Sequence, residues 1–221
     1  MKIKALVSVR SGSLRVQNKN MRPFAGKSLL EIKIAQLLKV SNLDGIVINS
    51  NDDAMLAIGK KMGCEIVKRE QQFATNDAPM SEVYRHMAEH IDSDVIAAIT
   101  VTNPLMTAET IFQTIELYKK LTQITPFDSV NTVNSVKEFL FRDNQPINYQ
   151  LENQPRSQDL PDIYSLNFAC NVIKKEDMIQ YKNVVGRKPY LHVVDEIEGL
   201  DIDTMVDFEC AEFLYKKKYG L

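Results

Sequence analysis

The sequence predicts one α/β domain built around a mostly parallel β-sheet, with helices on both faces of the sheet. Three observations support this prediction. Strand-like and helix-like segments alternate over the first 120 residues, which is typical of βα units wound into one sheet. The early strands are continuously apolar, as strands covered on both faces are. A chain of 221 residues also suffices for one well-buried core and is short for two domains.

The individual elements are predicted from the spacing of apolar residues and from residues that typically begin or end a helix. Apolar or β-branched runs predict strands at 3–9, 44–50, 64–69, 94–101, 128–136, 164–173 and 190–197. Apolar residues at helical spacing predict helices at 28–41, 52–63, 80–91, 108–121 and 205–218. Ser28 with Glu31 three residues later is a capping-box pattern, and Gly63 is a typical helix terminator.

An insertion interrupts the alternation at about residues 137–165. Its short apolar pieces are broken by Pro146, Pro155 and Pro161, so we expect a hairpin and loop rather than another βα unit. On a lone subunit its large apolar residues would form a patch of the kind that soluble proteins usually cover. These residues are Phe139, Leu140, Phe141 and Tyr149. We therefore expect the insertion to pair two subunits.

The composition argues against several classes of partner and compartment. The net charge is −2, so there is no global basic field for nucleic acid. No apolar run approaches the ~18 residues that a membrane span needs, and the first apolar run is too short for a signal peptide. Three isolated cysteines, Cys64, Cys170 and Cys210, fit buried thiols in a reducing compartment. We expect a cytoplasmic protein with no nucleic-acid or membrane partner.

A loop of small and basic residues follows the first strand. It contains Arg10, Ser11, Gly12, Ser13, Arg15 and Lys19, and few acids. Open α/β sheets bind nucleotides at the carboxyl ends of their strands, where such side chains can neutralise phosphates. The loop contains neither GxGxxG nor GxxxxGK[ST]. On spacing alone, a solvated basic loop is an equal alternative.

Two carboxylates lie two residues apart in "EGLDIDT", residues 198–204. In an extended chain Asp201 and Asp203 point to the same side. With nothing basic beside them they would be costly unless a cation lay between them, and magnesium favours such oxygen ligands. The spacing also fits a solvated acidic pair before a helix. We interpret His86, His90 and His192 as structural or surface residues, because no third zinc ligand accompanies the first two.

Together these stretches resemble the acylneuraminate cytidylyltransferase family. The opening loop is similar to its R-x-x-S-x-x-x-x-x-K-N pattern, "RSQDLP" to R-x-Q-D-L-P, and "DIDTMVD" to D-I-D-T-x-x-D, and collinear matches run from residue 3 to about 214. The resemblance implies a Rossmann-like nucleotide-binding fold and a reaction in which a nonulosonic, sialic acid-like 2-keto sugar acid attacks CTP. The products would be a CMP-sugar and pyrophosphate. It also implies Mg²⁺ as cofactor and a homodimer formed by the inserted dimerisation element.

The resemblance assigns roles position by position. The nucleotide side would comprise Arg10, Ser11, Gly12, Ser13, Arg15, Lys19, Asn20, Arg69 and Ser81. The sugar side would comprise Thr102, Asn103, Arg156, Gln158 and Asn167. Arg10, Lys19 and Asp203 would be catalytic, and Asp201 with Asp203 would hold magnesium.

The sequence also departs from the family pattern, mainly on the sugar side. The departures are Leu14, Thr100, Val101, Met106, Phe168 and Asn171. They bear on the identity of the sugar more than on nucleotide binding. Two alternatives stay open: a sugar nucleotidylyltransferase with another substrate or nucleotide, and a non-catalytic nucleotide-binding paralogue.

Overall fold

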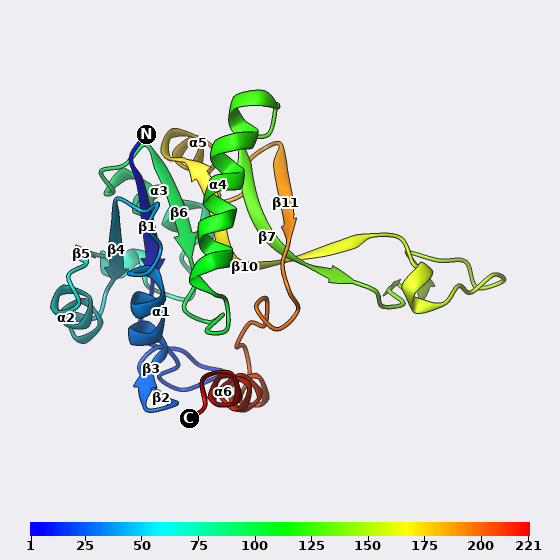
Figure 1. The fold of residues 1–221 in the computed structure, drawn as a ribbon, viewed down its shortest axis with the longest axis horizontal. Coiled ribbons are helices and arrows are strands. Elements are labelled where there is room, and N and C mark those ends of the chain that lie inside the picture. Colours follow the sequence, from blue (N-terminus) through cyan, green and yellow to red (C-terminus); the bar gives the residue numbers. More distant parts are fainter.

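A seven-stranded sheet in the order β11-β7-β10-β6-β1-β4-β5 forms the centre of the protein, which a computed structural model describes over residues 1–221 (Figure 1). Its strands are β1 (Ile3–Ser8), β4 (Gly45–Ser50), β5 (Glu65–Lys68), β6 (Val95–Ile99), β7 (Ser129–Val136), β10 (Ile163–Lys174) and β11 (Pro189–Val193). Strand β10 runs antiparallel to both of its neighbours, whereas the other pairs are parallel. The predicted mostly parallel sheet is confirmed.

Helices cover both faces of the sheet, as predicted. They are α1 (Leu29–Leu37), α2 (Asp53–Lys61), α3 (Met80–Glu89), α4 (Ala108–Ile124), α5 (Lys175–Tyr181) and α6 (Met205–Tyr219). A cluster of 34 buried residues joins α1, α2, α4 and α6 to one face, and a cluster of 10 joins α3 and α5 to the other. Strand β1 serves both clusters because its side chains alternate: Ala5 and Val7 belong to the larger cluster and Leu6 to the smaller.

The end signals read from the sequence are present where the helices begin and end. Ser28 caps α1 in a complete capping box with Glu31, and Gly63 follows α2 with a φ of 83°. Sequence reasoning missed α5, because it is only seven residues long and its N-cap, Lys174, makes no side-chain capping bond. It also missed the two-residue hairpin strands β2 (Pro23–Phe24) and β3 (Lys27–Ser28).

Residues 137–162 extend away from the sheet as an arm between β7 and β10 (Figure 1, yellow-green to yellow). The arm contains the small hairpin β8 (Phe141–Arg142) and β9 (Gln145–Pro146) and a short 3₁₀ turn, Ser157–Asp159. The ring of Tyr149 packs edge-on against Phe139, with ring centres 5.0 Å apart, and against Phe141 at 5.9 Å. The predicted hairpin and loop are confirmed; pairing of subunits through them stays a prediction.

The sheet order creates a crevice where the chain changes direction. From β1 the chain moves to β4 and β5 on one side, and then returns to place β6 on the other side. Ligands of open α/β sheets bind at such a switch point, outside the carboxyl ends of the strands. The segments that follow β1, β4, β5 and β6 border this crevice.

Two further findings concern the cysteines and the helices. All three cysteines are free; Cys64 and Cys170 are buried. The prediction of a buried thiol was wrong for Cys210, which lies on the outer side of α6 and is exposed. None of the helices combines the length and apolar character needed to cross a membrane.

Candidate active site

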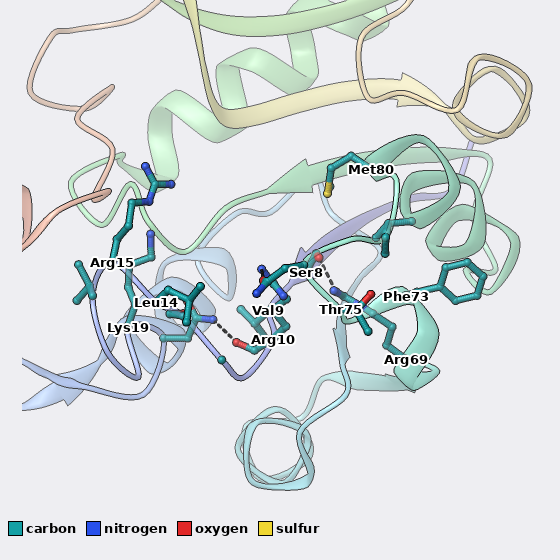
Figure 2. Close-up of a pocket in the computed structure, with 17 residues that line it drawn as sticks. Ser8, Val9, Arg10, Leu14, Arg15, Lys19, Arg69, Phe73, Thr75 and Met80 are labelled. Atoms are coloured by element: carbon teal, nitrogen blue, oxygen red, sulfur yellow. Dashed lines mark hydrogen bonds between the residues drawn. The ribbon is translucent and has the colours of Figure 1, made fainter.

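A cavity of about 460 Å³, called the first cavity here, opens at the carboxyl end of β1 (Figure 2). Its walls are the loop after β1, the loop that links β5 to α3, and the first turns of α3. Seven of the residues assigned to the nucleotide side line it: Arg10, Gly12, Ser13, Arg15, Lys19, Asn20 and Arg69. The structure thus brings together side chains from positions 10 to 69.

Local hydrogen bonds shape the loop after β1. Asn20 donates from Nδ2 to the backbone oxygen of Arg10 over 3.0 Å, which closes the loop on itself. Ser11 does not line the cavity; its amide and hydroxyl bond the side chain of Asn51 at 3.3 and 3.1 Å. Gly12 has a φ of 86°, a left-handed conformation that glycine adopts without strain. The loop is therefore held open around the cavity.

Arg69 provides a fixed positive charge at the base of the first cavity. Its side chain is buried, and it donates from Nε to Asn49 Oδ1 at 2.7 Å and from Nη2 to Ser8 Oγ at 2.5 Å. Its Nη1 has no partner within the chain, although the residue lines the cavity. Desolvation, reinforced by the charge of Arg10, lowers the pKa of Arg69 to about 10. The guanidinium therefore remains charged at neutral pH and can donate to an anion.

Arg10 joins the two loops that face each other across the cavity. Its Nη1 donates to the backbone oxygen of Ala74 at 2.9 Å, and its Nη2 donates to Asn76 Oδ1 at 2.7 Å. Sequence reasoning missed Asn76 and the apolar part of this wall, which includes Phe73 and Met80. The sequence did contain an indication of this wall. The polar loop "EQQFATNDAP" follows a predicted strand, so it is expected at the same edge of the sheet as the basic loop.

A buried histidine supports the apolar wall. The ring of His86 stacks on Phe73 with ring centres 4.1 Å apart, and the ring of His90 lies 4.3 Å from His86. Burial lowers the pKa of His86, which keeps the stacked ring neutral. His192 lies elsewhere, against the Thr114 hydroxyl at 3.1 Å. The stacking of His86 and His90 in this wall agrees with the interpretation of both as structural residues.

The acidic segment, residues 201–204, does not line the first cavity, but it contacts two cations that do, Arg15 and Lys19. Lys19 donates to the backbone oxygen of Ile202 at 2.5 Å, and Arg15 pairs with Asp203 at 2.8 Å. Figure 2 shows Arg15 and Lys19 together, away from Arg69 and Phe73. The expectation that nothing basic lies beside Asp203 was wrong, because the loop after β1 folds back onto residues 201–204.

The two carboxylates lie on the outer side of the segment, as their spacing predicts. Ile202 between them is completely buried, whereas Asp201 is exposed and Asp203 half-buried. Partial desolvation raises the pKa of Asp201, and the charge of Asp203 raises it further. Burial lowers the pKa of Lys19, while both carboxylates oppose that shift. Arg15 and Lys19 thus offset part of the negative charge of the two carboxylates.

The residues assigned to the sugar side do not converge in the same way. Asn103 is fully buried; its Oδ1 accepts from Thr100 at 2.5 Å and its Nδ2 donates to the backbone oxygen of Leu200 at 3.1 Å. Asn167 is also buried, between the Thr132 hydroxyl at 2.7 Å and Asn134 Oδ1 at 2.8 Å. Both amides are therefore committed to holding the protein together.

The other assigned residues lie in three places. Thr102 accepts from the backbone amide of Ile202 at 2.9 Å, beside the acidic pair. Arg156 and Gln158 are exposed on the arm, where Arg156 pairs with Asp159 at 2.7 Å. Ser81 is exposed in the first turn of α3, next to the lining residue Met80 but outside the lining itself.

Comparison with known proteins gives a consistent result. A family profile described as cytidylyltransferase matches residues 4–219. N-acylneuraminate cytidylyltransferase of Escherichia coli O18:K1:H7 is 25% identical over 221 residues, which cover 98% of this chain and 53% of that protein. Pseudaminic acid cytidylyltransferase of Campylobacter jejuni serotype O:2 is 24% identical over 230 residues, covering 98% and 97%. The chain thus spans about half of the first relative and nearly all of the second.

Among solved structures, CMP:2-keto-3-deoxy-manno-octonic acid synthetase complexed with CTP superposes with a TM-score of 0.70 at 8% identity. The match covers 99% of this chain and 100% of that one, and it shows that the two share a fold. The family profile spans almost the whole chain, and both the basic loop and the acidic segment lie inside it. The chain belongs to the cytidylyltransferase family of nucleotidyltransferase enzymes.

Proposed function

We propose that this enzyme transfers CMP from CTP to a nonulosonic, sialic acid-like 2-keto sugar acid and releases pyrophosphate. The observation that carries the proposal is the first cavity, in which Arg10, Arg15, Lys19 and Arg69 line one space. Four cations around a cavity of about 460 Å³ fit a triphosphate. The relatives named for N-acylneuraminate and pseudaminic acid support a sugar acid as the acceptor.

The chain's own residues would bind and orient the nucleotide. The unpartnered Nη1 of Arg69 offers a donor in a fixed position, and the apolar wall at Phe73 offers a face for the base. Lys19, anchored to the Ile202 carbonyl, would hold phosphate oxygens while staying close to the acidic segment. Phosphoryl transfer depends on such positioning and charge neutralisation more than on covalent participation.

Asp201 and Asp203 fit a magnesium ion that is shared with the substrate. Magnesium is usually held by one or two carboxylates plus substrate phosphates, and the chain places two carboxylates beside the cations Arg15 and Lys19. When bound, the metal would offset the charge on the phosphates and on the leaving pyrophosphate. Desolvation raises the pKa of Asp201 and the charge of Asp203 adds to the rise; a bound cation would oppose both effects.

We also propose a homodimer in which the arm contributes to the acceptor side. Arg156 and Gln158, assigned to the sugar side, lie on an arm that extends away from the sheet. Phe141, Ile147 and Leu151 on the same arm are each more than half exposed, so a second subunit would cover apolar surface there. Light scattering should report a dimer at micromolar concentration; a monomer would remove this part of the proposal.

The cytoplasm is the proposed location. All three cysteines are free, and free thiols fit a reducing compartment.

The experiment that tests the function is pyrophosphate release with CTP and a panel of nonulosonic acids. UTP, GTP and ATP serve as nucleotide controls, and a sugar phosphate serves as the acceptor control. Turnover only with CTP and a sugar acid supports the proposal. Turnover with a sugar phosphate or another nucleotide would indicate the other nucleotidylyltransferase class, and CTP binding without any turnover would indicate a binding protein.

A further inference from the structure

The two carboxylates of the acidic segment lie in a part of the chain without regular secondary structure. Residues 194–204 connect β11 to α6 and contain neither helix nor strand (Figure 1, orange). A helix or strand is held by its own backbone hydrogen bonds, whereas such a connection depends on the groups that contact it. The contacts of this connection therefore determine where Asp201 and Asp203 lie.

The loop after β6 provides most of these contacts. Asn103 donates from Nδ2 to the backbone oxygen of Leu200 at 3.1 Å and to that of Gly199 at 3.3 Å. The backbone amide of Ile202 donates to the backbone oxygen of Thr102 at 2.9 Å. Two consecutive loop residues thus bond the connection on both sides of the first carboxylate.

The connection also packs closely against its surroundings. A Cβ atom at Gly199 would lie 1.9 Å from Oδ1 of Asn134, so only glycine fits there. Nδ2 of Asn134 donates to the backbone oxygen of Gly199 at 3.4 Å, and the Glu198 carboxylate accepts from the backbone amide of Thr107 at 3.4 Å. The connection cannot shift toward the sheet, and its place depends on the loop after β6.

Helix α1 holds that loop from its other side. Lys33 donates from Nζ to the backbone oxygen of Asn103 at 2.8 Å, and Gln36 donates from Nε2 to that of Pro104 at 2.6 Å. Both side chains are buried, and residues three apart lie on the same face of a helix. A line of contacts therefore runs from α1 through the loop to the acidic segment.

The buried position of Lys33 is unfavourable for stability. Its ammonium group has three donors, but it makes one hydrogen bond within the protein. Desolvation lowers its pKa to about 7, although Glu198 and Cys170 oppose the shift. An apolar side chain of similar size would avoid this cost, so what the ammonium group adds is its bond to the loop. Unfavourable groups of this kind are typical of functional sites.

We propose that Lys33 and Asn103 are positioning residues that hold Asp201 and Asp203 in place for the reaction. This inference rests on the proposed function. Neither positioning residue lines the first cavity, so both would act through the acidic segment and not by touching the nucleotide. Asn103, assigned by resemblance to the sugar side, would thus serve the reaction without binding the sugar. A displacement of about 1 Å can lower a rate about 100-fold.

Lys33→Met tests the first contact. Methionine fills a similar space without a charge, so the protein should fold with a Tm near that of the wild type. We expect kcat for pyrophosphate release to fall at least about tenfold. CTP affinity, measured by calorimetry with a chelator present, should change less than about twofold, because the first cavity is intact. Hydrogen exchange in the peptide 198–204 should become at least about tenfold faster.

Asn103→Ser tests the second contact. It keeps the backbone oxygen that accepts from Lys33 and removes the amide that donates to Gly199 and Leu200. The same loss of kcat and the same faster exchange are expected, with circular dichroism giving the folded fraction to which each rate refers. KM for the sugar acid should change less than about twofold, whereas loss of a residue that binds the acceptor would raise it.

The double variant tests whether the two residues act through one line of contacts. Its kcat should lie within about twofold of the more impaired single variant, since the second change breaks a contact that is already ineffective. Losses that multiply would show that Lys33 and Asn103 act independently, and would overturn the inference.

Lys175→Met is the matched control. Lys175 also donates from Nζ to a backbone oxygen, that of Ile91 at 2.7 Å, but it lies at the start of α5 on the opposite face of the sheet. It should change neither kcat nor the exchange of the peptide 198–204. Wild-type kcat or unchanged exchange in Lys33→Met would overturn the inference. Hydrogen exchange needs no substrate, so it decides whether Lys33 holds the segment even if the wild type is inactive and the proposed function fails.

Discussion

The two sides of the crevice at the switch point are built in different ways. On the side of the first cavity, the Nη1 of Arg69 has no hydrogen bond within the protein, whereas both terminal nitrogens of Arg10 bond the opposite loop. On the side after β6, the amides of Asn103 and Asn167 are spent on neighbouring groups in the protein. Residues that the same resemblance assigns to a binding site thus differ in their surroundings: some line an open cavity, and others are buried and hold the loops in place.

The largest expected effect concerns the acidic segment between the two sides. Asp203→Asn keeps the size of the side chain and removes a charge that faces Arg15 and Lys19. Turnover should fall at least about 100-fold, as expected for the loss of one preorganised electrostatic element. Initial rates across a magnesium titration measure this, and a chelator should abolish wild-type activity. Glu209→Gln, an exposed change on α6, is the control. Normal turnover of Asp203→Asn at limiting magnesium would place the metal elsewhere.

The second prediction compares the stability of a variant at a buried amide with that of a variant on the exposed arm. Asn167→Ala leaves Thr132, Asn134 and the amide of Ala169 without their partner. The free energy of unfolding should fall by about 2 kcal/mol, since buried polar groups lose their hydrogen bonds. Urea unfolding measures the change. Arg156→Ala, on the exposed arm, should leave stability within about 0.5 kcal/mol. Equal stability of the two variants would show that the two sides do not differ as described.

A third prediction concerns the first cavity itself. Arg10→Ala removes a cation and its bonds to Ala74 and Asn76. Charge-assisted contacts to phosphate contribute about 1.5–3 kcal/mol, so CTP affinity should weaken at least about tenfold. Calorimetry with CTP gives the affinity, and circular dichroism checks the fold. Lys39→Ala, an exposed cation beyond α1, should bind CTP normally. Undiminished affinity in Arg10→Ala would exclude the loop as the triphosphate site.

The last prediction concerns a buried lysine that supports the side after β6, and its effect within any one pH unit is small. Lys33 is fully buried and donates to the backbone oxygen of Asn103 at 2.8 Å, and desolvation lowers its pKa to about 7. Between pH 7 and 10 the unfolded chain therefore binds more protons at Lys33 than the folded protein. The free energy of unfolding of the wild type should rise relative to Lys33→Met by about 1 kcal/mol per pH unit in that window. Parallel pH curves for the two proteins would show that Lys33 is solvated.

The sequence predicted those parts of the fold that depend on residues close together in the chain. The capping box at Ser28 and the apolar period of β1 depend on neighbours in the chain, and so does the basic composition of the loop after β1. The direction of β10 and the short helix α5 depend on packing across the sheet. The spacing of apolar residues along the chain does not indicate such packing. The same limit explains why sequence reasoning missed Asn76 and the ion pair between Arg15 and Asp203.

The hydrogen bond from Lys19 to the Ile202 carbonyl spans 183 positions of the chain, and this separation has a consequence for synthesis. A ribosome adds about 5–20 residues per second, so roughly ten to forty seconds pass between the appearance of the two partners. During that interval the basic loop exists without the acidic segment that faces it. A nascent chain that stops before residue 202 can fold much of the sheet, yet it lacks Asp203 beside Lys19. The contact between the basic loop and the acidic segment therefore forms only after residue 202 has been synthesised.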